Sequence, residues 1–193
     1  MKKLILFLLI PLVMPAFAQK WAKDYDFVDN ANNGLSMVKK DGKYGFVDLN
    51  GKVVIPLDYD EAIAFSEGYA PLRKGGLWQF ADSTGKMIMP LSYLDALCFH
   101  EGLAAVATKE GWGYINPTGQ FEIRPQFDAA RGFREGVAAV SNKKGQWGYI
   151  DKKANLVIPY QYTMAENFEN GVARVMKGDK VMNINRENKV VPD

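Results

Sequence analysis

The sequence predicts an all-β protein built from tandem copies of a three-stranded antiparallel unit. A turn tripeptide ending in glycine returns at steps of 34, 34, 34 and 35 residues. Its copies are Asn32-Asn33-Gly34, Ser66-Glu67-Gly68, His100-Glu101-Gly102, Arg134-Glu135-Gly136 and Glu169-Asn170-Gly171. Short alternating apolar segments separate these turns, as half-buried strands do. A period in this range means that one supersecondary unit is copied along the chain, so residues that look special belong mostly to the repeat.

The first 18 residues are predicted to be a secretory signal peptide rather than part of the fold. Lys2 and Lys3 precede an apolar run over residues 4–13, and Ala16-Phe17-Ala18 is a small-x-small cleavage site. The run is too short to span a bilayer, and no later segment approaches the ~20 apolar residues that a transmembrane helix needs. We therefore expect an exported protein, periplasmic or extracellular, without membrane insertion after cleavage.

Residues 19–193 are expected to form a single β-repeat domain of four full units and a degenerate cap. Their approximate bounds are 34–67, 68–101, 102–135, 136–170 and, for the cap, 171–193. We expect the units to stack as an open superhelical array. The alternative is a closed five-bladed ring like a propeller, because five similar connectors could close a circle.

Each unit is expected to hold three strands in a fixed order. The first follows the turn glycine, and its second residue is always Ser or Ala, which indicates close packing: residues 35–38, 69–72, 103–106, 137–140 and 172–175. The second is rich in aromatic residues: residues 44–48, 78–82, 112–116 and 147–151. The third ends at a proline, which stops the ladder: residues 53–56, 87–90, 121–125 and 156–159. In the connector, a capping residue before alanine-rich sequence (Asp60 before Glu61-Ala62) predicts one short helical turn.

This pattern resembles the WG repeat, also called the KWG repeat, of bacterial β-rich proteins. The resemblance rests on residues 99–106, 111–119 and 123–128, and it covers residues 24 to about 190. Tyr44 stands where the motif has Trp, Gln79 stands where it has Gly, and the fifth unit loses its aromatic pair at residues 181–185. A polar, degenerate last unit is typical of a terminal cap. The resemblance implies a repeat-forming protein without an established activity, so it supplies no catalytic residue.

Charge and cysteine content exclude several classes of function. Removing residues 1–18 removes two lysines, so Lys and Arg fall from 24 to 22 and match the 22 Asp and Glu. A mature chain of zero formal charge lacks the basic stripe that nucleic acid requires, so no nucleic-acid partner is expected. The single cysteine, Cys98, cannot form an intramolecular disulfide, and it replaces a small apolar residue of the other units.

No residue pattern points to catalysis, a metal or a cofactor. The lone His100 occupies a position that varies between units. Glu67, Glu101 and Glu135 recur at equal spacing, whereas catalytic carboxylates must face each other across one bond. We interpret them as turn residues that bond to local backbone. The protein is therefore predicted not to be an enzyme.

One recurring aromatic position can be interpreted in two ways, and each interpretation favours a different function. Tyr44, Trp78, Trp112 and Trp147 open the second strand of successive units. The favoured interpretation is a packing layer between units. The alternative is a row of exposed rings that stack on a ligand such as a sugar. The first agrees with a non-enzymatic scaffold that binds a protein partner of the bacterial envelope or the extracellular space. The second agrees with a carbohydrate or cell-wall binding module whose partner is a polysaccharide.

Overall fold

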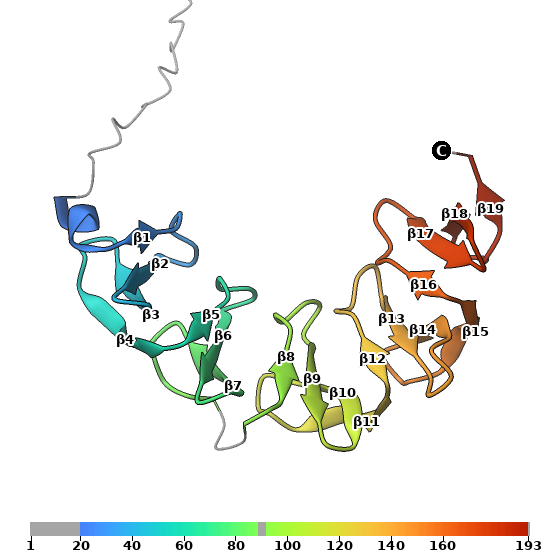
Figure 1. Ribbon diagram of the computed structural model, residues 1–193, viewed down its shortest axis with the longest axis horizontal. Coiled ribbons are helices and arrows are strands. Elements are labelled where there is room, and N and C mark those ends of the chain that lie inside the picture. The colour runs from blue at the N-terminus through green and yellow to red at the C-terminus, as the bar shows by residue number, and fades with distance from the viewer. Residues whose placement is uncertain (1–19, 89–91, 193) are drawn as a thin grey trace, which may run out of the picture.

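The computed structural model describes residues 20–88 and 92–192, and in it five antiparallel sheets follow one another along an open arc (Figure 1). The two ends of the arc do not meet. The all-β class and the open array are thus confirmed, and the alternative of a closed ring is wrong. The predicted signal peptide lies outside the described residues.

The sheets take their strands in chain order. A 3-10 helix, η1 (Lys20–Asp24), precedes sheet 1. Sheet 1 contains β1 (Phe27–Val28), β2 (Leu35–Lys40), β3 (Lys43–Asp48) and β4 (Val53–Tyr59); sheet 2 contains β5 (Glu61–Ala62), β6 (Tyr69–Lys74) and β7 (Leu77–Asp82); sheet 3 contains β8 (Asp95–Ala96), β9 (Ala104–Thr108), β10 (Gly111–Ile115) and β11 (Phe121–Phe127); sheet 4 contains β12 (Ala129–Ala130), β13 (Val137–Ser141), β14 (Trp147–Asp151) and β15 (Leu156–Tyr162); sheet 5 contains β16 (Met164–Ala165), β17 (Val172–Lys177), β18 (Lys180–Asn185) and β19 (Val190–Val191).

The connector predicted as a helical turn is instead a two-residue strand. In sheet 2, Glu61 pairs with Arg73 and Ala62 with Leu72, and the corresponding residues of the other sheets pair in the same way. The prediction was wrong because one helical turn gains a single hydrogen bond, whereas the edge of the next strand offers the connector ready partners. Four of the five sheets therefore have four strands rather than three.

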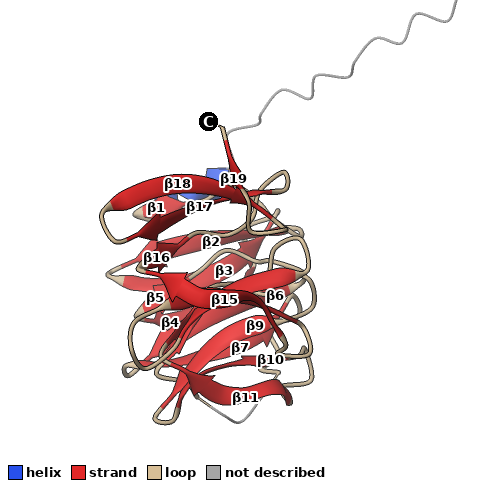
Figure 2. Cartoon of the chain, turned by 90° about the vertical axis from the view of Figure 1, so that its right-hand side faces the viewer, coloured by secondary structure: helices blue, strands red, loops and turns tan. Residues whose placement is uncertain are grey.

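The sheets are stacked, and their strands cross the width of the arc (Figure 2). Successive hairpin turns therefore emerge alternately at two opposite edges. The turn after each short first strand projects into the hollow of the arc (Figure 1). We call these five turns, residues 32–34, 66–68, 100–102, 134–136 and 169–171, the inner turns.

The hydrophobic core lies between the sheets. The cluster between sheets 3 and 4 combines Leu103, Tyr114 and Ile123 with Phe133 and Val140. Each interface holds an edge-on aromatic pair that joins the third strand of one sheet to the residue before the next inner turn. The four pairs are Phe46–Phe65, Phe80–Phe99, Tyr114–Phe133 and Tyr149–Phe168, with centroids 4.8 to 5.2 Å apart. The small residues of the first predicted strands, Ser36, Ala70, Ala104, Ala138 and Ala173, are all buried. The sheets thus depend on their neighbours for their cores.

The glycine of the aromatic strand is required by a close approach of backbone. A Cβ at Gly113 would lie 2.6 Å from the Ile123 carbonyl oxygen and 2.7 Å from the Pro125 nitrogen. The pairing of β10 with β11 is irregular at this point, as it is in sheets 1 and 4. In sheet 2, Gln79 stands in place of this glycine. Among the described residues, this sheet has no regular fourth strand, and only two isolated bridges take its place. The glycine therefore permits the kinked pairing of the proline-bearing strand.

The two ends of the arc lack the residues that join the sheets. In the register of sheet 4, Ala139 faces Tyr149, and in sheet 5 the equivalent pair is Arg174 and Asn183. At the other end, Ala31 stands where later units have the buried phenylalanine. A polar last sheet agrees with the predicted terminal cap. Both end sheets therefore differ from the internal sheets at the positions that form the shared cores.

Candidate functional site

The inner turns hold glutamate in a conformation that glutamate rarely adopts. Glu67, Glu101 and Glu135 have φ values of 52°, 53° and 52°, in the left-handed region that favours glycine and asparagine. The glycine that follows each of them also has a positive φ. Because this backbone is unfavourable for glutamate, its side chain must supply a compensating interaction.

That interaction is a ladder of hydrogen bonds from sheet to sheet. The Glu67 carboxylate accepts from the Glu101 N–H at 2.6 Å and the Gly102 N–H at 2.8 Å. The carboxylate of Glu101 accepts from the Gly136 N–H at 2.9 Å, and that of Glu135 from the Gly171 N–H at 3.0 Å. The sequence prediction of bonds to local backbone was wrong, because each partner lies one repeat further along the chain. The recurrence showed that the glutamate belongs to the turn but could not show which turn it contacts.

Replacing Glu101 with alanine is expected to destabilise the fold by about 1.5–3 kcal/mol, which is typical of a lost hydrogen bond to a charged group. Asn170→Ala is the matched control, since Asn170 has the same left-handed backbone, with φ of 54°, in the last inner turn. Urea unfolding of both variants measures the difference. Equal losses would mean that the backbone conformation matters and the ladder does not.

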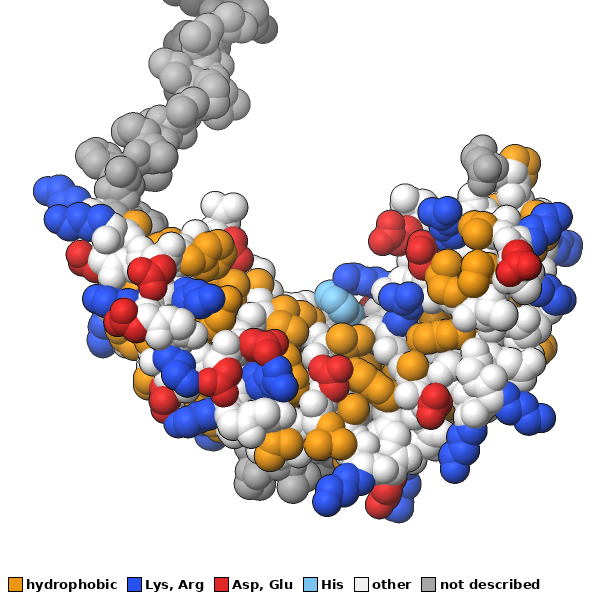
Figure 3. Space-filling model, in the orientation of Figure 1, with side chains coloured by type: hydrophobic (Ala, Val, Ile, Leu, Met, Phe, Trp, Pro, Cys, Tyr) orange, Lys and Arg blue, Asp and Glu red, His pale blue; other side chains and the backbone are white. Residues whose placement is uncertain are grey.

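The residue before each of these turn positions varies from sheet to sheet. The five side chains are Asn32, Ser66, His100, Arg134 and Glu169. The first two still reach the next sheet, where the Asn32 amide donates to the Phe65 carbonyl and the Ser66 hydroxyl to the Phe99 carbonyl, each at 2.6 Å. The five residues are half-buried or exposed. Figure 3 shows the single histidine at the hollow of the arc, with a basic side chain beside it.

His100 links three sheets. Its Nε2 lies 3.0 Å from a guanidinium nitrogen of Arg134, and its Nδ1 lies 3.4 Å from the Ser66 hydroxyl oxygen. A guanidinium only donates hydrogen bonds, so Nε2 accepts and the proton of the neutral ring is on Nδ1. Burial lowers the pKa of His100, and the charge of Arg134 lowers it further, against the opposite effect of Glu67 and Glu101.

Acidification is expected to weaken the fold through His100. Because its pKa is lowered in the folded state, the neutral ring contributes stability above about pH 6.5, the ordinary value. This contribution is lost as the pH falls from there through the lowered pKa. His100→Gln should flatten the stability profile over this range, measured by urea unfolding at a series of pH values. An unchanged profile in the variant would assign the acid sensitivity to the carboxylates instead.

The structure places three members of the predicted aromatic column, Trp78, Trp112 and Trp147, in or against the cores between sheets. Trp78 is only 7% exposed and belongs to the core between sheets 2 and 3. Tyr44, Trp112 and Trp147 are half-buried. The Lys39 ammonium lies 4.8 Å from the Tyr44 ring centroid, and the Arg131 guanidinium lies 5.6 Å from that of Trp147. Trp112 also lines an open groove between sheets 3 and 4.

The thiol of Cys98 is half-buried, and burial raises its pKa. Its sulfur lies 4.0 Å from the Ala64 carbonyl oxygen of the preceding sheet. A protonated, partly covered thiol agrees with the predicted packing role. Across residues 20–88 and 92–192, no group of three His, Cys, Asp or Glu side chains is arranged to hold a metal. In the same residues, no helix has the length and apolar character needed to cross a membrane.

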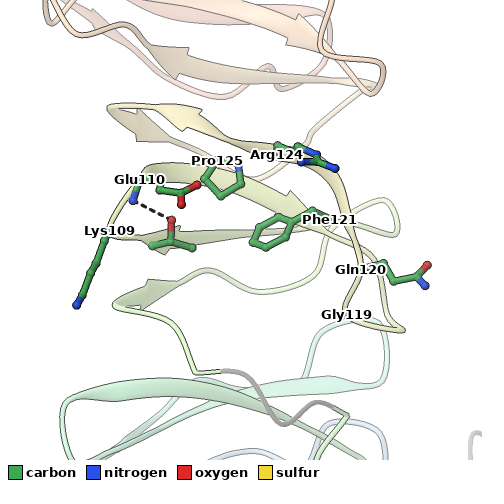
Figure 4. A pocket seen from close by; sticks show the side chains of 8 residues that line it. Lys109, Glu110, Gly119, Gln120, Phe121, Arg124 and Pro125 are labelled. Carbon is green, nitrogen blue, oxygen red and sulfur yellow. Dashed lines mark hydrogen bonds between the residues drawn. The ribbon is translucent and has the colours of Figure 1, made fainter.

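A hollow of about 620 Å³ lies against the outer strand of sheet 3 (Figure 4). Lys109, Glu110, Phe121, Arg124 and Pro125 are among its lining residues. The Glu110 N–H donates to the Thr108 hydroxyl at 3.1 Å, which fixes the turn at its rim. Its lining thus combines charged groups of both signs with one aromatic ring.

Comparison with known families identifies the repeat. The model of the WG containing repeat matches five times, at residues 22–44, 44–78, 80–110, 112–145 and 147–180. The chain belongs to the WG-repeat family. This family is a repeat module that is not known to be enzymatic. No curated protein sequence matches the chain.

Solved structures similar to this WG-repeat chain share its fold at low identity. The computationally designed protein Ika8 is 12% identical, with a TM-score of 0.56 over 86% of this chain and 61% of its own. Hsv2 from Kluyveromyces lactis is 12% identical, with a TM-score of 0.53 over 82% of this chain and 59% of its own. The chain thus spans about three fifths of the length of these structures. The likeness shows a β-propeller-like repeat fold.

Proposed function

We propose that this WG-repeat chain is an exported, non-enzymatic scaffold of the bacterial cell envelope, periplasmic or extracellular, that binds a protein through the hollow of its arc. The observation that supports the partner surface is the contrast within the inner turns. In the three central sheets, phenylalanine, glutamate and glycine recur at these turns and hold them in place. The residue between the phenylalanine and the glutamate changes from Ser to His to Arg. A repeated frame that presents different side chains along a concave surface is how repeat proteins recognise an extended partner.

The variable side chains of the inner turns favour a partner that carries both positively and negatively charged groups. Arg134 and Glu169 are exposed and of opposite charge, and Ser66 and His100 are partly accessible. Arginine is enriched at the energetic centres of protein interfaces. We therefore expect the central inner turns to dominate binding.

A crosslinking pull-down of the tagged protein from its own cell envelope, read by mass spectrometry, tests the partner. One reproducible protein partner is expected, and His100→Ala/Arg134→Ala should reduce its capture at least about tenfold. Lys40→Ala/Lys180→Ala is the matched control, because both lysines are exposed in hairpin turns at the edge opposite the inner turns. The proposal fails if no protein is captured reproducibly, or if both double variants capture it equally.

Export has its own test. The protein recovered from periplasm or medium is expected to begin at Gln19, because the cleavage signal ends at Ala18. Mass spectrometry of the intact protein measures this directly. Recovery of the full precursor from the cytoplasm alone would contradict the envelope location and leave the interaction surface to be tested separately.

A further inference from the structure

A second candidate site lies at the opposite edge of the arc, between sheets 3 and 4. Two adjoining hollows of about 390 and 340 Å³ share Gln126, Phe127 and Lys143 in their linings. Tyr160 lines the first and Trp112 the second. β9 starts just after an inner turn and ends at Thr108, which lines the second hollow, so this groove and the inner turns lie at opposite ends of the strands.

At two of the other interfaces, a lysine bridges the position that is open here. Between sheets 1 and 2, Lys74 forms an ion pair with Asp58 across the same position. Between sheets 4 and 5, the Lys177 ammonium donates to the Gln161 side-chain oxygen at 3.0 Å. In the register of sheet 4 the equivalent of these lysines is Asn142.

Asn142 does not cross the gap. Its side-chain oxygen accepts from the N–H groups of Lys144 at 2.9 Å and Gln146 at 3.1 Å, so it serves its own turn. Across the groove, the Gln126 amide donates to the Arg124 carbonyl of its own strand at 3.4 Å. Both sides therefore bond within their own sheet and leave the space between them accessible.

The aromatic lining is also specific to this interface. Trp112 borders the groove in a half-buried state, whereas the equivalent Trp147 lies beneath the Arg131 guanidinium, which is itself held by a 2.7 Å hydrogen bond to the Ala165 carbonyl. Leu97 takes the place of Arg131 in sheet 3 and packs against the core. Among the described residues, cations lie over the rings of Tyr44, Trp147 and Phe168 and not over that of Trp112.

The polar groups at this groove are better suited to bind the hydroxyl groups of a neutral ligand than to bind a ligand with a single charge. The lining of the two hollows mixes charges of both signs, with the ammonium groups of Lys109, Lys143 and Lys144 beside the carboxylates of Glu110 and Asp128. The Gln126 amide adds a donor and an acceptor. A half-buried aromatic ring among a few polar groups of mixed character is a common design of small-molecule sites. We propose that this groove binds a neutral saccharide chain, with Trp112 against the apolar face of one sugar ring.

Saturation-transfer difference NMR and calorimetry with chitotriose, maltotriose and cellotriose test this site. At least one trisaccharide is expected to bind with a Kd near about 1 mM or below, corresponding to a modest single-site interaction. Asn142→Lys introduces the lysine of sheets 2 and 5 and should weaken that binding at least about tenfold by bridging to Gln126. Lys177→Asn is the matched control, because it removes the bridge at another interface and should leave the affinity unchanged.

Three results would overturn the proposal. The first is that none of the three sugars binds at about 10 mM. The second is that the Asn142→Lys variant binds the sugar with the affinity of the unmodified protein, and the third is that polyglutamate binds and the sugars do not. Gln126→Ala, an exposed substitution, gives a second test should Asn142→Lys unfold. Neither groove variant should alter capture of a protein by the inner turns, so this inference and the proposed scaffold function fail independently.

Discussion

Phe133→Ala is expected to destabilise the protein by about 3–5 kcal/mol, the range for truncating a buried aromatic side chain. Phe133 is fully buried and meets Tyr114 of the preceding sheet with ring centroids 4.8 Å apart. The same interface holds the hydrogen bond from the Tyr114 hydroxyl to the Arg131 carbonyl, at 2.8 Å. Loss of the ring therefore removes apolar contact area and loosens a buried polar contact at once.

Urea unfolding followed by tryptophan fluorescence and circular dichroism measures this loss. Phe27→Ala is the control, because Phe27 is 45% exposed at the first short strand. We expect the control to unfold nearly as the unmodified protein does. A similar small change for both variants would mean that the interface between sheets 3 and 4 contributes little to stability.

Gly113→Ala is expected to cost about 1–3 kcal/mol or more, as overpacking of a tight site does. The added methyl group would meet the backbone of Ile123 and Pro125, which cannot turn aside as a side chain can. We expect the pairing of β10 with β11 to open. Hydrogen exchange of the β11 amides, together with the urea midpoint, reports both effects.

Gly132→Ala is the matched control for that variant. A Cβ at Gly132 would lie 3.2 Å from a ring carbon of the His100 side chain, which can rotate away. Its effect should be much smaller than that of Gly113→Ala. If the two variants lose equal stability, the close approach of the backbone is not the reason for the glycine.

The repeat period made most of the fold predictable, because the residues that build the cores recur visibly. The phenylalanine before each later inner turn and the aromatic strand both stand out in the sequence, and the structure brings them together as Phe133 on Tyr114. The short strand of Glu61 and Ala62 was not predictable in the same way. Its pairing depends on a neighbouring edge, and two residues carry no periodicity of their own.

The candidate sites were less predictable than the fold, since they depend on contacts between units. The recurrence of Glu67 gave its place in the turn, but its partner Gly102 is set by how one sheet lies on the next. Trp112 and Trp147 look equivalent in sequence, and only the Arg131 side chain makes their surroundings differ. The one available signal was the unusual choice of glutamate, rather than asparagine, beside the turn glycine.

Because each core is shared by two neighbours, the gene encoding this chain can change length by whole repeats. Duplicating sheet 4 would place the Tyr149 face against a second Phe133 face, and deleting it would place the Tyr114 face against the Phe168 face. Losing sheet 5 would instead expose Tyr149, which is now covered by Phe168. Evolution by unequal recombination would therefore tolerate changes inside the array and select against changes at its ends.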